Sequence, residues 1–178
     1  SQTKRLAVNI YKASRRIQEL LQDLVNVSRG SSKGAESCRV REVLAAAADA
    51  SAAQAESQGV AIRVEAPDSL EVPLERARIE RVLFNLISNA LEAMPAGGEI
   101  RMSARAEGPT ARLEVEDNGP GIPAAVRDSL FQPFVTAGKK NGLGLGLALS
   151  RQAILDHGGD MWVEDAPGAR FVIRLPGQ

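Results

Sequence analysis

The sequence predicts an α+β fold: a two-layer α/β sandwich with helices on one face of a mixed sheet, preceded by a long N-terminal helix. Two observations predict this class. Apolar residues recur at heptad spacing in the first segment, between residues 4 and 28. After that segment, helical and strand-like stretches follow one another without regular β–α–β alternation. The 178 residues are 44% hydrophobic and 25% charged, as is usual for a folded globular chain.

The first segment is expected to be a helix that packs against other helices. An isolated helix of this length is marginal in water, so it needs a partner helix or must lie on its own domain. Small polar residues at 31–38 predict a linker, which divides the chain into a bundle or coiled-coil helix (1–30), the linker and a domain at 39–178. The heptad seam consists of Leu6, Ile10, Ala13, Ile17, Leu20, Leu24 and Val27.

The rest of the chain is expected to alternate between helices and strands. Apolar stripes and stop signals, such as Gly59 and residues 95–98, place the helices. Alternating apolar and polar residues place the strands. We expect helices at about 39–58, 75–94, 124–131 and 147–157, and strands at about 60–65, 70–72, 99–106, 111–116, 161–164 and 170–175.

The composition argues against several classes of protein. Basic and acidic residues number 22 each, and this balance argues against a surface built to bind nucleic acid. The single cysteine, Cys38, allows no internal disulfide and no thiolate metal cluster, so a reducing compartment is favoured. No apolar run approaches the roughly 20 residues that span a bilayer, and no signal peptide is visible. Since the chain begins with Ser1, we expect a fragment or a processed product.

The first cluster with chemical potential lies on the expected helix at 75–94. Asn85 and Asn89 are four residues apart, so both amides leave the same face, which borders the apolar stripe. Such a position is unfavourable unless each amide has polar partners. Asn85 and Asn89 are therefore either two partly exposed helix residues or side chains that bind a polar ligand. Mg²⁺ is one such ligand, because it binds amide oxygens and also substrate phosphates.

Two glycine-rich clusters follow. In the segment 116–123, Asp117 is placed to accept hydrogen bonds at the mouth of a pocket, although a plain turn has the same composition. Gly119 and Gly121 would allow a flat ligand to approach the backbone closely. At 142–149, glycines precede a helix N-terminus, which favours an anion such as phosphate. A dinucleotide-binding motif would need a strand before these glycines, and a loop is expected there.

In this order, the clusters resemble the motifs of the catalytic, ATP-binding domain of sensor histidine kinases, in the wider class of the DNA gyrase ATPase subunit and MutL. The asparagine helix resembles the N box, and the sequence from Asp117 to Gly121 resembles the first glycine box. Residues 130–134 resemble the F box, and residues 142–147 resemble the second glycine box. The resemblance covers about residues 36–176 and implies a Bergerat-type ATP-binding fold.

The resemblance also implies roles for individual residues. Asp117 would accept a hydrogen bond from the adenine amino group, and Asn89 would bind Mg²⁺. Asn85 would contact phosphate or a metal-bound water, and residues 124–143 would form a lid anchored by Phe131 and Phe134. The implied ATP site comprises Asn85, Asn89, Asp117, Gly119, Gly121, Ile122, Phe134, Lys139, Gly142, Leu143, Gly144, Leu145 and Gly146.

Some positions depart from the family pattern. Leu143 and Ala169 stand where the family often has threonine. Leu143 removes one hydroxyl from the second glycine box, and Ala169 removes the threonine that the family's water-mediated adenine contact depends on. Two additional residues, Ala137 and Gly138, leave open whether Lys139 or Lys140 contacts phosphate. Related ATPases have a water-activating glutamate at the position of Asn85, so ATP hydrolysis is expected to be slow here.

The phosphoryl acceptor is therefore expected to be a histidine on a dimerisation bundle. The helix at 4–28 resembles the second helix of that bundle, and the first helix, with its acceptor histidine, is absent from the sequence. His157 is expected to cap the last helix, with Gly158 in a left-handed conformation. We expect an ATP-binding cytoplasmic fragment that does not phosphorylate itself, from a parent that forms homodimers and acts on a response regulator receiver domain. Membrane attachment of the parent is left open.

Other functions remain possible from the sequence alone. They are an ATP-driven machine of the gyrase or MutL type, a serine kinase acting on an anti-sigma partner, and a non-enzymatic interaction module. Asn85 and the short chain argue against the first, and the kinase-like helix at 4–28 argues against the second.

Overall fold

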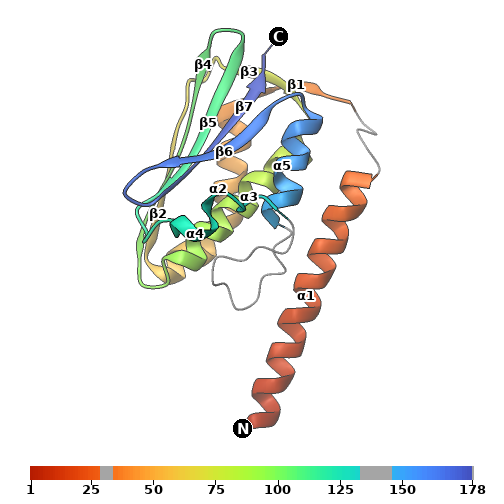
Figure 1. The fold of residues 1–178 in the computed structure, drawn as a ribbon, viewed down its shortest axis with the longest axis vertical. Coiled ribbons are helices and arrows are strands. Elements are labelled where there is room, and N and C mark those ends of the chain that lie inside the picture. Colours follow the sequence, from red (N-terminus) through yellow and green to blue (C-terminus); the bar gives the residue numbers. More distant parts are fainter. Residues whose placement is uncertain (29–33, 133–145, 178) are drawn as a thin grey trace.

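The computed structural model describes residues 1–28, 34–132 and 146–177, except for the side chains at 19, 20 and 22–28. A long helix, α1, extends away from a compact α/β body, and one end of α1 lies beside α5 (Figure 1). The elements in chain order are α1 (Gln2–Ser28), β1 (Glu36–Arg39), α2 (Val40–Gln58), β2 (Val60–Glu65), β3 (Glu71–Leu74), α3 (Arg76–Ala93), β4 (Gly98–Glu107), β5 (Thr110–Asp117), α4 (Ala124–Arg127), α5 (Gly146–Asp156), β6 (Asp160–Asp165) and β7 (Ala169–Pro176).

The main sheet has five strands in the order β2-β4-β5-β7-β6. Strands β2 and β4 are parallel, and the other neighbouring pairs are antiparallel, so the sheet is mixed. Helices α2, α3 and α5 cover one face of it (Figure 1). The predicted two-layer sandwich with a preceding long helix is therefore confirmed.

Helix α3 supplies much of the core because its apolar residues recur on one face. Its C-terminal end is held by Gln58 at the end of α2, whose Nε2 donates to the carbonyl oxygens of Leu91 (2.8 Å) and Met94 (3.2 Å). Gly59, with φ 71°, ends α2 as predicted. The buried stripe of α3 comprises Ile79, Val82, Leu83, Leu86, Ile87, Ala90 and Leu91.

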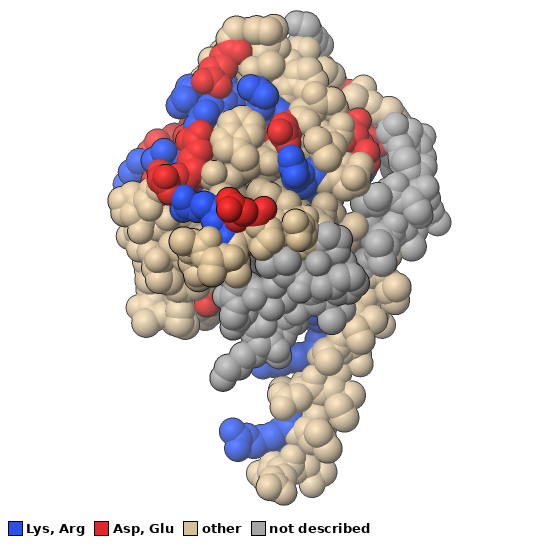
Figure 2. All heavy atoms as spheres, in the orientation of Figure 1, with Lys and Arg blue, Asp and Glu red and all other residues tan. Residues whose placement is uncertain are grey.

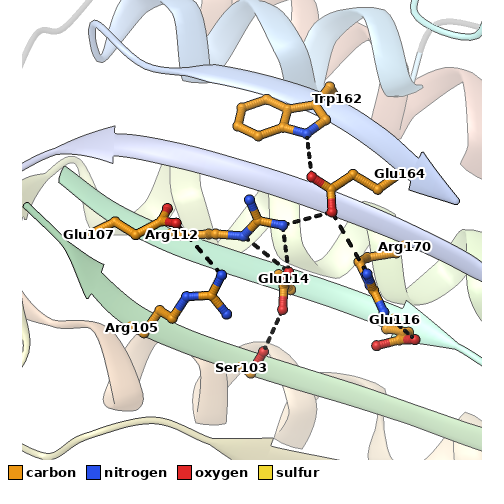
Figure 3. Close-up of polar contacts among 9 residues, drawn as sticks. All are labelled: Ser103, Arg105, Glu107, Arg112, Glu114, Glu116, Trp162, Glu164 and Arg170. Atoms are coloured by element: carbon orange, nitrogen blue, oxygen red, sulfur yellow. Dashed lines mark hydrogen bonds and ion pairs between the residues drawn. The ribbon is translucent and has the colours of Figure 1, made fainter. Parts of the chain in front are cut away.

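The opposite face of the sheet carries a network of charged side chains (Figure 3). Arg112 donates to Glu114 (2.8 Å) and Glu164 (2.7 Å), and the Trp162 indole N–H donates to Glu164 (3.1 Å). Val172, which pairs with Trp162 across the strands, is fully buried on this face. Figure 2 shows both signs of charge interspersed over this region. The network therefore keeps the face polar while covering apolar surface.

Two elements differ from the sequence prediction. Residues 36–39, expected in the linker and at the start of a helix, form β1, which pairs with β3 in a separate two-stranded sheet. The helix expected at 124–131 ends at Arg127. The amides of Ser129, Leu130 and Gln132 each bond to the carbonyl three residues earlier, so this stretch forms tight turns.

None of the helices in the described parts of the chain combines the length and apolar character required to cross a membrane.

Candidate functional site

Asp117 lies at the end of β5 in a cradle of backbone amides. Its carboxylate oxygen Oδ1 accepts hydrogen bonds from the amides of Gly119 (2.9 Å) and Ala169 (3.3 Å). Only 8% of the residue is exposed. Burial raises the pKa of the Asp117 carboxyl, against the opposing effect of the two amides. Since both amide bonds go to Oδ1, the second oxygen can accept a hydrogen bond from a ligand.

The cradle depends on three glycines that lie close to other backbone or side-chain atoms. A Cβ atom at Gly168, in the turn between β6 and β7, would collide with the carbonyl oxygen of Asp117. A Cβ at Gly119 would lie 3.0 Å from Met94 Cγ and 3.1 Å from Asp117 Oδ1. Gly121 has φ 82°, and a Cβ there would lie 3.4 Å from the carbonyl oxygen of Gly168. The glycines thus allow the Asp117 segment to pack against Met94 and the β6–β7 turn.

Side chains next to the Asp117 cradle hold its backbone in place. Asn118 faces β4, where its Oδ1 accepts from the Glu99 amide (2.8 Å). Met94 is 4% exposed and lies at the end of α3, between Gly98 and Gly119. Ile122 is partly buried against the core. Sequence reasoning missed the supporting roles of Gly168 and Met94; the only signal for Gly168 was the family pattern that precedes Phe171.

The asparagine pair lies on α3, the helix that Met94 caps at its C-terminal end. Both Asn85 and Asn89 are partly buried, and the Nδ2 of Asn85 donates to the hydroxyl of Ser150 on α5 (3.3 Å). At 1.5 Å per residue, Asn89 and Asn85 lie about 7.5 and 13.5 Å along the helix axis from Met94. Helix α3 therefore connects the Asp117 cradle to the two amides over about 7.5–13.5 Å.

The start of α5 and the F-box residue Phe131 border this region. Gly146 opens α5 and is partly buried. Phe131 packs edge-to-face on Phe171 of β7, with ring centroids 6.2 Å apart, and the Arg151 guanidinium lies 5.5 Å from the Phe131 centroid. These contacts attach Phe131, a few residues after α4, to the body. The remaining predicted site residues, Phe134, Lys139, Gly142, Leu143, Gly144 and Leu145, lie outside the described residues.

The donor set is compatible with a magnesium ion that is held largely by a substrate. Across the described residues, no group of three or more His, Cys, Asp or Glu side chains is placed to bind a metal. Magnesium often needs only one or two protein ligands, because it keeps several waters and binds substrate phosphates. The partly buried Asn85 and Asn89 offer amide oxygens of this hard type.

His157 lies at the other end of α5 and serves a structural role. Its Nδ1 is 2.7 Å from the carbonyl oxygen of Ala153, and its Nε2 accepts from the amide of Glu75 (3.0 Å), just before α3. Gly158, with φ 80°, has the left-handed conformation that was predicted. His157 therefore ties the end of α5 to the start of α3.

The chain is similar to known proteins over most of its length. The model of the family described as histidine kinase-, DNA gyrase B-, and HSP90-like ATPase matches residues 74–178. The alginate biosynthesis sensor protein KinB of Pseudomonas aeruginosa is 40% identical over 169 residues, which cover 90% of this chain and 28% of KinB. The sensory histidine kinase/phosphatase NtrB of Klebsiella oxytoca is 40% identical over 122 residues, which cover 62% of this chain and 35% of NtrB. The chain thus spans only about a third of these relatives or less.

Solved structures share the fold. The catalytic domain of the histidine kinase ThkA gives a TM-score of 0.74 at 29% identity, covering 80% of this chain and 95% of that domain. ThkA in complex with the response regulator protein TrrA gives a TM-score of 0.81 at 24% identity, covering 100% of this chain and 52% of the matched chain. The second match, which shows the fold alone, extends over the N-terminal helix as well.

Proposed function

The chain belongs to the family of histidine kinase-, DNA gyrase B- and HSP90-like ATPases, and from this premise we propose that it donates the γ-phosphoryl group of ATP within a two-component sensor histidine kinase. The acceptor is a histidine on a bundle helix outside this sequence. The relatives and structures with which it aligns are sensor and histidine kinases, which supports this branch of the family over the others.

The observation that carries the proposal is the cradle of Asp117. Two backbone amides hold Oδ1, and the second oxygen accepts a hydrogen bond from the exocyclic amino group of adenine. Because only 8% of Asp117 is exposed, water competes poorly with a base that binds there. Guanine carries an acceptor oxygen at the corresponding position, which a carboxylate repels, so the cradle selects adenine.

The asparagine pair acts on the phosphates. Asn89 contributes an amide oxygen to Mg²⁺, and Asn85 lies one turn closer to the N-terminus on the same face of α3. When bound, the ion neutralises charge on the phosphates. A carboxamide is a poor general base, so Asn85 does not activate water, and the phosphoryl group is kept for the histidine acceptor. Catalysis then consists of positioning and charge neutralisation.

We further propose that α1 is one helix of a homodimeric bundle. The described seam residues Leu6, Ile10 and Ile17 are 62%, 59% and 50% exposed, so this part of the seam does not lie on its own domain. Exposed apolar residues at heptad spacing favour burial against other helices.

Because ThkA is seen in complex with a response regulator, the parent of this chain is proposed to act on a receiver domain as well.

The test uses this chain, Mg²⁺, ATP labelled on the γ-phosphate, and a separate helical bundle that supplies a histidine acceptor. We expect acid-labile label on the bundle, slow ATP hydrolysis and no label on the chain. At subsaturating ATP, Asp117→Asn should lower transfer at least about tenfold, whereas His157→Gln should leave it intact and would exclude His157 as an acceptor. Fast hydrolysis without transfer would instead support an ATPase of the gyrase type, and no binding at millimolar ATP would leave only an interaction module.

A further inference from the structure

Three polar residues are buried in the described part of the chain: Ser51, Asp117 and Ser150. Ser51, on α2, donates to the Ala47 carbonyl oxygen of its own helix (3.1 Å). Ser150, on α5, is similarly buried, with 2% exposure against 3% for Ser51, but its hydroxyl accepts a hydrogen bond from Nδ2 of Asn85 on α3 (3.3 Å). Its hydroxyl therefore connects α5 to the asparagine pair, a contact that core packing alone does not require.

This bond determines which atom Asn85 can present to a ligand. A carboxamide is planar, with its NH₂ group and its oxygen on opposite sides of the Cγ atom. Since Nδ2 points to α5, Oδ1 points away from Ser150. An amide oxygen accepts from a metal-bound water or binds a cation, whereas a phosphate oxygen needs a donor. The family resemblance left open whether Asn85 contacts a phosphate or a metal-bound water.

We propose that Ser150 is a positioning residue that orients the Asn85 carboxamide, so that Oδ1 faces the divalent cation and its water shell. This inference rests on the proposed ATP-binding function. Ser150 acts through Asn85 and touches neither nucleotide nor metal itself. It lies four residues after Gly146, one turn into α5, so it also links the start of this helix to the metal side of the site.

Removal of the hydroxyl should affect the metal-dependent part of nucleotide binding. In Ser150→Ala, Nδ2 of Asn85 loses its acceptor on α5, and the amide can rotate. The net value of a neutral hydrogen bond predicts an affinity for Mg-ATP that is about two- to tenfold lower. The affinity for ATP in EDTA should not change, because the Asp117 cradle is untouched.

The experiment is isothermal titration of the full chain with ATP, once with Mg²⁺ and once with EDTA. Ser150→Thr retains a hydroxyl and should restore most of the affinity for Mg-ATP. Ser51→Ala is the matched control, because it removes a hydroxyl of similar burial from another helix and should change neither titration. Equal losses with Mg²⁺ and with EDTA, or no loss in Ser150→Ala, would overturn the proposal.

A second variant tests the orientation even if Ser150→Ala folds poorly. Asn85→Ala removes the carboxamide itself, so it should lower the affinity for Mg-ATP while the affinity for ATP in EDTA stays unchanged. If Asn85→Ala weakens binding equally with Mg²⁺ and with EDTA, the carboxamide faces a phosphate and not the cation, which overturns the orientation. If the unaltered chain binds no ATP at all, the proposed function fails before this inference is tested.

Discussion

Asp117→Asn is the most direct test of base recognition, because it changes one atom of the buried carboxylate. The Asn oxygen can still accept from the amides of Gly119 and Ala169, so the backbone of the cradle is expected to stay in place. The new NH₂ group then takes the position of the oxygen that accepts from adenine. Two donors face each other, and the charge-assisted hydrogen bond to the adenine amino group is lost.

The magnitude follows from the burial of the site. A hydrogen bond to a charged group contributes about 1.5–3 kcal/mol, so ATP affinity should fall about ten- to 150-fold. Stability should not fall with it. Because the pKa of Asp117 is raised in the folded chain, its neutral form contributes stability below the ordinary value of 3.8, and that contribution is lost as the pH rises through the folded pKa. Asparagine is neutral at every pH, so the variant should be at least as stable as the parent at pH 7.

The assay combines calorimetric titration of ATP and GTP with urea denaturation of both proteins. We expect the preference of the parent for ATP over GTP to shrink in Asp117→Asn, because the amide NH₂ can donate to the guanine oxygen. The ATP affinity of the parent should also decline as the pH falls through the raised pKa of Asp117. Unchanged ATP affinity in a folded variant would remove Asp117 from the base pocket and refute the proposed function.

Three further predictions test the supports of the site and the N-terminal helix. Gly168→Ala should lower ATP affinity more than tenfold, measured by titration, because its Cβ collides with the backbone of Asp117 and lies 2.8 Å from Oδ1. His157→Ala should lower the free energy of unfolding by about 1–2 kcal/mol in urea, because the partly buried Glu75 amide loses its acceptor, while ATP affinity stays unchanged. Ile10→Glu should abolish concentration-dependent self-association in light scattering; a parent that stays monomeric at all concentrations would contradict the role given to α1.

The sequence predicted most of the fold because local patterns and tertiary contacts agree in most elements. The stripe of α3 and the alternation of β5 each specify a buried face without information from elsewhere. Strand β1 was missed because its four residues are mostly exposed and show no such pattern; pairing with β3 makes it a strand. In the same way, the first glycine box predicted a role for Asp117. The need for glycine at 168 was missed because it arises from the contact of Gly168 with Asp117, which lies 51 residues earlier in the chain.

The geometry of the site depends on how firmly α3 is held, since this helix carries Asn85 and is capped by Met94. Its N-terminal end is attached through the bond from the Glu75 amide to His157, and its C-terminal end through Gln58. Sites built on elements held in this way keep their spacing more closely than sites on loops. Replacing Gln58 or His157 should therefore lower the free energy of unfolding. ATP affinity should fall when Gln58 is replaced, but not when His157 is replaced. The Gln58 bonds lie at Met94, beside the Asp117 cradle, whereas His157 lies at the far end of the helix.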